Sequence, residues 1–534
     1  MGFVAGAINP TYVHQVHPLR NPRLRRAPCR NKKLMKPVSP SKVLSIEPGI
    51  IPAPGKSSVT NTLLALARNN ASCFHDPEDA IAYASIKRVD HEEIVRLNSD
   101  RFSDWLKALY FRETGSAAPN SALDNAVSTL QAIANEFGEQ HRVHRRSAKL
   151  GDRYYIDLCD DARRVVEVDH AGWRIIDQSP VKFVRSSTMR ALPHPTTGGK
   201  FKPLLDILNV VEEHWIILLV WLIECLRPET NHVGLELIGT HGAAKSTTHR
   251  ILVNFIDPQN ENLLVKPKVR EDIFVTAANS HVLSYENLSE LSAPIQDALC
   301  SMLTGAAFQK RKNYSDTLVS SIKFKRPVIL NGINRTVTRP DLLDRFICFE
   351  LPAIPDGARV DDGQVSQQFE SMKSEVFGAI LSRFAKALAL LPKVKTQKLP
   401  LPRMADFALL GEAVAQSLGK PSGYFCNTYR ALRDGSISAL LAGSPLGSAI
   451  LSYLGENNGQ IFGSYTHVHD QLLHHQTTKG GVTSTLDGWP KRGKAFGNEL
   501  RRLTPALQQK GISVRVTGPK KDGFYCSIKH DKKV

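Results

Sequence analysis

The sequence has no C-x-x-C pair, no apolar run long enough to cross a bilayer, and no acidic residue among its first 43 positions. Its eight cysteines lie far apart, which argues against a zinc ribbon or a disulfide framework and favours a reducing, cytoplasmic compartment. The most apolar stretch, residues 215–226, is interrupted by Glu224 and predicts a buried helix. No signal-peptide pattern is visible at the start.

The charge of the chain is concentrated at its two ends. Residues 1–43 hold nine Lys/Arg and no acid, and residues 491–534 hold twelve Lys/Arg against Glu499, Asp522 and Asp531. The net charge of +18 therefore belongs to the ends, and residues 44–490 are neutral overall. Basic segments on a neutral body are typical of contacts to a phosphate backbone, so DNA is the leading partner. Basic tails that only aid solubility are the alternative.

Periodicity predicts elements along most of the 534 residues, which have room for two to four domains. Helices are expected near 92–111 and 121–137, and the alternating runs "RYYIDL", "RVVEVD" and "GWRII" predict a small sheet. Residues 364–440 predict helices, with Phe369, Met372, Val376 and Ile380 forming an apolar core stripe. Residues 1–72 lack periodicity and predict a disordered tail.

Residues 235–255, "LELIGTHGAAKSTTHRILVNF", predict a strand, a glycine turn and a helix. This arrangement suits a nucleoside triphosphate, because backbone N–H groups must converge on the phosphates where no bulky side chain intervenes. Lys245 would reach the phosphates and the Ser246 hydroxyl would hold Mg²⁺, so ATP and Mg²⁺ are the predicted ligands. The predicted cradle consists of Gly239, Thr240, His241, Gly242, Ala243, Ala244, Lys245, Ser246 and Thr247.

The cradle departs from the usual pattern G-x-x-x-x-G-K-[ST] at one position, where Ala244 replaces the last glycine. A positive φ at that position would strain an alanine. The remaining string is short enough to recur by chance, so its strand-turn-helix setting carries the prediction. A plain glycine turn before a helix is the alternative.

Two later apolar runs end in the polar residues that a phosphate loop requires. "SHVLSYENLS" ends in Glu286 and Asn287, and "RPVILNGINR" ends in Asn331. Glu286 is predicted to hold Mg²⁺ and orient water, and Asn331 to sense the γ-phosphate. Ordinary strands that end in polar turns are the alternative.

The C-terminal region from residue 445 predicts three helices and a hairpin, an order that suits a DNA-binding winged helix. Phe496, Leu500, Leu503 and Leu507 form one apolar face. The polar residues off this face and at the hairpin tip are the predicted DNA contacts: Lys494, Asn498, Arg501, Arg502, Gln508, Lys520 and Lys521. A solvated amphipathic helix is the alternative.

The order of the phosphate loop, "SYENLS", "RPVILNGI" and "RPDLLDRFICFEL" resembles the AAA+ superfamily 3-like helicase domain of phage and plasmid primase-helicase proteins. The resemblance implies that Arg345 acts as an arginine finger in a neighbouring subunit, with Arg339 as the fallback, in a ring that is expected to be a hexamer. It also implies a pore hairpin within "FQKRKNYSDTLVSSIKF", where Lys310, Arg311 and Lys312 would contact a threaded strand.

We therefore expect an α/β fold with a P-loop AAA+ core and a Mg²⁺-dependent ATPase that acts on DNA. The predicted domains are a basic tail (1–72), an α+β accessory domain (73–200), the ATPase core (201–355), a helical lid (356–444) and a winged helix (445–534). A non-hydrolysing, nucleotide-sensing replication-initiation protein is the alternative, supported by Ala244 and by the single acid Glu286. A small-molecule P-loop kinase is disfavoured by the basic ends.

Overall fold

The computed structural model describes residues 58–78, 80–311, 319–480, 488–520 and 523–531. The first region is a helix-covered sheet with strand order β3-β2-β1-β4. Its elements are α1 (Val59–Asn70), β1 (Ala71–His75), β2 (Ala82–Lys87), β3 (Glu92–Arg96), α2 (Asp100–Thr114), α3 (Asn120–Phe137) and β4 (Glu139–Gln140).

Two predictions in this region are wrong. The tail predicted for 1–72 ends earlier, because α1 is a regular helix that buries Leu63 and Ala67 completely in a core shared with α3; residues 1–57 lie outside the described part. The helix predicted near 92–111 is split, because Ile94 and Val95 are buried in strand β3. The helix begins only after Ser99, whose hydroxyl accepts the Phe102 N–H at 3.3 Å.

A second, antiparallel sheet of order β6-β7-β8-β9 follows, as the alternating runs predict. Its strands are β6 (Ser147–Leu150), β7 (Arg153–Asp157), β8 (Val165–Val168) and β9 (Trp173–Ile176), and the short strands β5 (Val143–His144) and β10 (Lys182–Phe183) pair beside it. Arg146, which precedes β6, is fully buried and pairs with Asp257 at 3.0 Å. This ion pair ties the second sheet to the region that follows.

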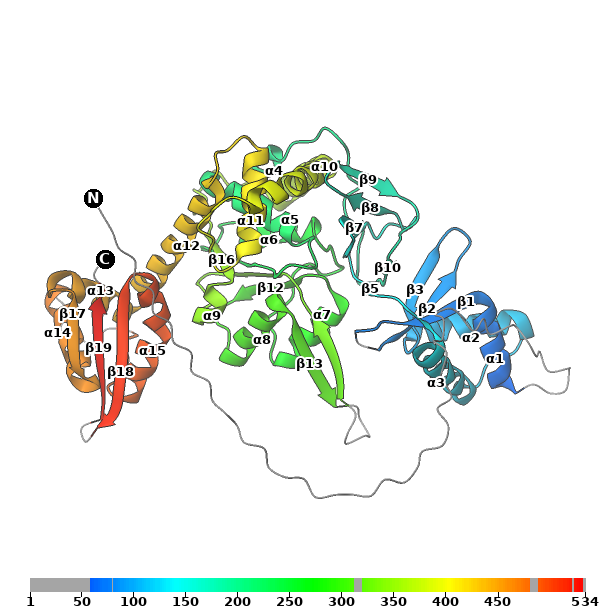
Figure 1. Ribbon diagram of the computed structural model, residues 1–534, viewed down its shortest axis with the longest axis horizontal. Helices are drawn as coiled ribbons and strands as arrows, with labels where there is room; N and C mark the ends of the chain where they lie inside the picture. The colour runs from blue at the N-terminus through cyan, green and yellow to red at the C-terminus, as the bar shows by residue number, and fades with distance from the viewer. Residues whose placement is uncertain (1–57, 79, 312–318, 481–487, 521–522, 532–534) are drawn as a thin grey trace, which may run out of the picture. The chain divides into compact units, whose positions relative to one another are not determined.

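The central region is a parallel sheet of order β12-β15-β11-β16, against which α6, α7 and α8 pack (Figure 1). Its strands β11 (Gly234–Ile238), β12 (Leu283–Leu288), β15 (Val328–Gly332) and β16 (Phe346–Glu350) are almost entirely buried, as expected for a sheet covered on both faces. The hairpin β13 (Ala306–Arg311) and β14 (Val319–Phe324) leaves this sheet between β12 and β15. The predicted α/β class is confirmed at this level.

The helices of this region are α4 (Lys202–Leu205), the 3₁₀ turn η1 (Glu212–His214), α5 (Trp215–Glu224), α6 (Lys245–Asn254), α7 (Arg270–Asn279), α8 (Ala293–Thr304) and α9 (Pro340–Leu343). The apolar stretch at 215–226 forms the buried helix α5, as predicted. In the described residues no single helix has the length and apolar character of a membrane span. One pair, Tyr424–Ala442 and Pro445–Glu456, has them only jointly, across a 101° bend.

Three long helices follow the sheet: α10 (Asp362–Lys395), α11 (Ala405–Ser417) and α12 (Tyr424–Ala442). Asp361 caps α10 by accepting the Gly363 N–H at 2.8 Å. The predicted stripe is confirmed, since Phe369, Val376 and Ile380 are buried in the core that also contains α5.

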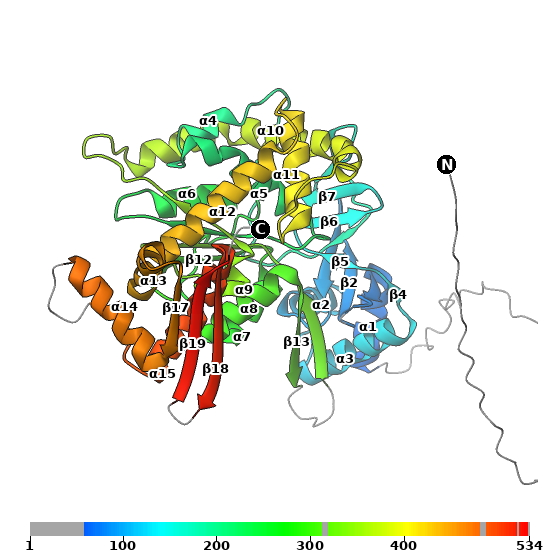
Figure 2. The same ribbon diagram turned by 60° about the vertical axis from the view of Figure 1, so that its left-hand side comes forward.

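The C-terminal region packs helices on an antiparallel sheet of order β17-β19-β18 (Figure 2). Its elements are α13 (Pro445–Glu456), β17 (Gln460–Ser464), α14 (Tyr465–Gly480), α15 (Lys494–Gln509), β18 (Ile512–Lys520) and β19 (Gly523–His530). The three helices and the hairpin were predicted, and all four residues of the α15 stripe are fully buried. Strand β17 was not predicted.

Candidate functional site

The loop between β11 and α6 follows the path that a phosphate cradle requires. Gly239 approaches the next strand so closely that an added Cβ would lie 2.8 Å from the Leu351 carbonyl oxygen. Gly242 has a φ of 76°, and an added Cβ there would lie 3.2 Å from the Arg359 guanidinium. A side chain is therefore excluded sterically at Gly239, and at Gly242 it is disfavoured by the positive φ.

Ala244 adopts the left-handed conformation, with φ 56° and ψ 28°, directly before the first residue of α6. This is the position at which the usual pattern has glycine. An L-residue there costs about 1–2 kcal/mol, because Cβ crowds the backbone. The loop therefore keeps a glycine-type geometry without the glycine.

The loop and the start of α6 offer a set of backbone donors for an anion. Within the described residues, the N–H groups of Gly242, Ala244, Lys245 and Ser246 form no hydrogen bond. Lys245 folds back, since its Nζ donates to the carbonyl oxygens of Gly239 at 2.8 Å and Thr240 at 2.6 Å, and burial lowers its pKa. Free donors, a lysine and the positive end of a helix together fit a polyphosphate.

Residues outside the predicted motif complete the surroundings of the loop. Asn209 donates to the carbonyl oxygens of Ala243 at 3.1 Å and Pro352 at 2.6 Å, which fixes the loop to the segment after β16. Arg359, from the same segment, lies over Gly242. Neither residue has a sequence signal, because both meet the loop only through the fold.

The parallel sheet brings the loop, Glu286 and Asn331 to the same edge. Strand β15 lies between β11 and β12, with Asn331 opposite Leu237. Carboxyl ends of neighbouring parallel strands form the usual ligand-binding edge of such a sheet. Glu286 is half-buried on β12, and within the described residues its carboxylate has no hydrogen bond or ion pair. A carboxylate in this state is available for a cation.

Asn331 is 2% exposed, and both atoms of its amide are bonded. Its Oδ1 accepts the Asn287 N–H at 2.8 Å, and its Nδ2 lies 2.9 Å from Nδ1 of His249 on α6. Nε2 of His249 lies 2.9 Å from the Ser284 hydroxyl on β12. Burial lowers the pKa of His249 to about 3, so the ring is neutral and links α6, β12 and β15. His249 and Ser284 were not predicted from the sequence, because they meet Asn331 only through the fold.

The two predicted finger arginines lie away from this edge. Arg345 precedes β16 at the amino end of the sheet, where its Nη1 donates to the Thr304 hydroxyl at 2.9 Å. Arg339 pairs through Nε with Asp297 at 2.9 Å. Neither residue is placed to act on the loop of its own chain, so the role in a neighbouring subunit stays a prediction.

The predicted DNA contacts are described only in part. The hairpin β13–β14 exists and is antiparallel, but the side chains of Lys310 and Arg311 and the whole of Lys312 lie outside the described residues. On α15, Lys494, Asn498, Arg501 and Gln508 are exposed. Arg502 is exposed too, and its Nη2 and Nε bond Glu499 at 2.6 and 2.8 Å.

At the hairpin tip, Lys520 ends β18 opposite Gly523, and its side chain, like the whole of Lys521, lies outside the described residues.

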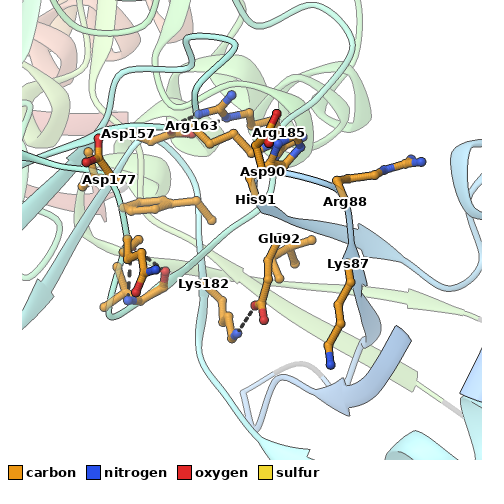
Figure 3. A pocket seen from close by; sticks show the side chains of 16 residues that line it. Lys87, Arg88, Asp90, His91, Glu92, Asp157, Arg163, Asp177, Lys182 and Arg185 are labelled. Atoms are coloured by element: carbon orange, nitrogen blue, oxygen red, sulfur yellow. Dashed lines mark hydrogen bonds and ion pairs between the residues drawn. The ribbon is translucent and has the colours of Figure 1, made fainter. Parts of the chain in front are cut away.

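A charged cavity of about 490 Å³ lies between the β2–β3 hairpin and the segment 177–185 (Figure 3). Its charges are matched internally. Lys182 pairs with Glu92 at 2.9 Å, and Arg185 pairs with Asp157 at 2.5 Å. Arg163 lies 3.5 Å from Glu93. This cavity therefore has little free charge for a ligand.

The fold is that of a mixed α/β protein with a parallel sheet and helices. Residues 203–435 match the family model described as actinomycete integrative conjugative element replication protein, and residues 446–533 match the model of the AICE RepA C-terminal domain. These matches, in chain order, identify the chain as a replication protein of a mobile element. No curated protein matches the chain.

Two solved structures are distantly similar to the chain. The A form apo structure of the NrS-1 C terminal region has 11% identity and a TM-score of 0.37, and the match covers 88% of this chain and 98% of that chain. A second structure of that region has a TM-score of 0.36 at the same identity and coverage.

Proposed function

We propose that this replication protein is an ATP-hydrolysing, DNA-acting motor of the AAA+ superfamily 3-like type. One observation carries the proposal: a loop with free N–H donors and Lys245 lies at the same sheet edge as the unpaired carboxylate of Glu286. The matches to replication proteins of a mobile element support DNA as the substrate on which it acts.

Each residue of this edge has a role in the proposed reaction. The backbone donors and Lys245 would hold the phosphates of ATP, and Ser246 and Glu286 would hold Mg²⁺, whose chemistry is to offset negative charge on phosphate oxygens. Glu286 orients the attacking water. Asn331 reports the phosphate through His249, because that ring ties Asn331 to the helix that carries Lys245. Arg345 completes the site of a neighbouring subunit in a ring.

The proposed DNA contacts lie on two elements. Lys310, Arg311 and Lys312 of the β13–β14 hairpin would contact a strand in the ring, and the C-terminal region would dock DNA as a winged helix. The exposed basic residues of α15 support this second role, since they lie on the side of the helix opposite its buried stripe.

The test is ATP hydrolysis by the full chain with and without single-stranded DNA. We expect DNA to stimulate turnover in the wild type and Lys245→Ala to lower kcat/KM about 10²–10³-fold, as the loss of one preorganised charge donor does. Lys268→Ala is the matched control, because Lys268 is exposed and outside the loop. Turnover that is absent, or equal in wild type and Lys245→Ala, contradicts the motor.

A second candidate is a non-hydrolysing protein that senses nucleotide and binds DNA. It is favoured by the strained Ala244 and by the amide of Asn331, whose atoms are both engaged inside the chain. In that case isothermal titration detects ATP binding that Lys245→Ala removes, while no phosphate is released.

A further inference from the structure

A second cleft, with a volume of about 860 Å³, lies where the first sheet, the β5–β6 turn and the base of the β13–β14 hairpin meet. Eight Lys/Arg line it, against the three acidic residues Asp76, Glu78 and Glu229. These acids are already engaged. Asp76 accepts the Val143 N–H at 2.7 Å, Glu78 pairs with Arg142, and Glu229 lies 3.3 Å from Lys149. The cleft therefore keeps an excess of positive charge.

Five of the eight cations form no ion pair within the described residues: Arg96, Arg145, Lys323, Lys325 and Arg326. Nζ of Lys325 donates to the Glu229 backbone carbonyl at 2.7 Å, so the four other cations are the ones considered as anchors. Arg145 is 8% exposed, and burial together with the nearby Arg326 and Arg96 lowers its pKa to about 9. Burial lowers the pKa of Arg326 to about 10, so both guanidiniums remain charged at neutral pH. Buried like charges without a counter-ion are costly, and proteins normally pair them.

The end of α7 holds two of these cations in place but does not neutralise them. Nη2 of Arg145 donates to the Ala278 carbonyl at 2.7 Å, and Nε of Arg326 donates to the Ala277 carbonyl at 3.1 Å. The negative end of a helix dipole suits cations, but it carries only about half a charge. Each guanidinium has five N–H donors, and these bonds leave several of them free.

We propose that this cleft binds the phosphate backbone of single-stranded DNA, with Arg96, Arg145, Lys323 and Arg326 as its anchors. The proposal rests on the proposed DNA-acting function and names the path of the strand. The four cations come from separate places, namely β3, the turn before β6, β14 and the segment before β15, which fits an extended polyanion better than one small anion. Lys323 and Phe324 continue the cleft into the hairpin.

The test uses Arg96→Gln and the double variant Arg96→Gln/Lys323→Gln in the full chain without nucleotide. Arg96 is half-buried and Lys323 is exposed, and no ion pair is broken by either change. Affinity for a fluorescein-labelled oligothymidine is measured by anisotropy over a range of salt concentrations. Arg190→Gln is the matched control, because Arg190 is an exposed arginine outside the cleft lining and its side chain forms no ion pair within the described residues.

We expect each lost phosphate contact to lower the slope of log affinity against log salt by about 0.7, which corresponds to about fourfold weaker binding at 0.15 M salt. The double variant should lose about fifteenfold, and the control should lose nothing. Thermal unfolding separates binding from packing. Arg96→Gln should unfold at the same or a higher temperature than the wild type, because it relieves repulsion among guanidiniums.

Four results overturn the inference. The first three are unchanged affinity and slope in both variants, a loss of affinity that only follows a loss of folded protein, and tighter binding of the equivalent RNA. The fourth is competition by pyrophosphate that is as strong as competition by the unlabelled oligonucleotide, because that result would show a site for a small anion and not for a strand. If the wild type binds no single-stranded DNA, the proposed function itself fails. If it binds and hydrolyses ATP but the variants behave as wild type, only the cleft is wrong.

Discussion

Ala244 is the residue at which the loop is most strained. Because φ is 56° there, Ala244→Gly removes about 1–2 kcal/mol of backbone strain from the folded state. The substitution also gives the unfolded chain more conformational freedom, which offsets about 0.4–1 kcal/mol of that gain in stability. We expect the free energy of unfolding to rise by about 0.5–1 kcal/mol, measured by urea denaturation of the full chain.

Ala243→Gly is the control for this change. Ala243 is fully buried, and its φ is not positive. Its substitution should destabilise the protein by about 1 kcal/mol, because a buried methyl group is lost and the unfolded chain gains freedom. Equal shifts of the same sign in the two variants would show that the conformation of Ala244 stores no strain.

At the scale of elements, α15 combines a buried stripe with a surface whose charge is partly cancelled. Arg502 bonds Glu499 through two donors, and side-chain hydrogen bonding from Arg502 lowers the pKa of Glu499. If α15 faces DNA, the Glu499 carboxylate opposes the phosphates. Glu499→Gln should therefore strengthen binding of duplex DNA about fivefold at 0.15 M salt, measured by anisotropy, since one more cation becomes available and each duplex phosphate contact contributes about 0.9 to the salt slope.

Glu370→Gln in α10 provides a comparison, because Glu370 also pairs with a cation three residues away on an exposed helix face. It should leave DNA affinity unchanged. An unchanged affinity in Glu499→Gln as well would remove α15 from the DNA interface and leave the C-terminal region without this support for a winged helix.

Elements with strong periodicity were predictable, and elements that depend on partners were not. The stripe of α15 is visible in the sequence because one face of that helix is buried. Strands β7 and β8 are visible as short runs of tyrosine, valine and isoleucine between turns, although nearly all of their residues are buried. Strand β17 alternates between exposed and buried positions, but its sequence does not show this, because the apolar Phe462 is exposed and the buried position after it is Gly463. The strand pairs with β19 on the edge that β18 leaves open. Helix α1 has only Leu63 and Ala67 as fully buried residues, too few to distinguish it from a tail.

At the scale of the whole molecule, the sequence shows charge at the ends, whereas the fold gathers charge in the middle. Arg96, Arg145 and Arg326 are separated by tens to hundreds of residues, so no local pattern could bring them together. The same limit applies to His249 and Asn331, which lie 82 positions apart and meet only because β15 lies beside β11. Lys245 and Ser246 were accessible to sequence reasoning because their geometry is local.

Buried neutral histidines should make the stability of the molecule sensitive to acid, and His144 tests this most directly. Burial, with the nearby Arg142, lowers its pKa to about 4, below the usual 6.5. The native state then resists protonation that the unfolded chain accepts. The stabilisation is complete above pH 6.5 and is lost as pH falls toward 4, at about 1.4 kcal/mol per pH unit.

In His144→Gln the part of the acid sensitivity that comes from the lowered pKa of His144 should disappear. The loss of unfolding free energy between about pH 7.5 and about pH 5 should shrink by about 2 kcal/mol relative to the wild type, measured by urea denaturation at both pH values. His170→Gln should leave that loss unchanged, because the His170 side chain is exposed. If His144→Gln keeps the full loss of the wild type, the buried ring does not resist protonation, and the acid sensitivity must come from other groups.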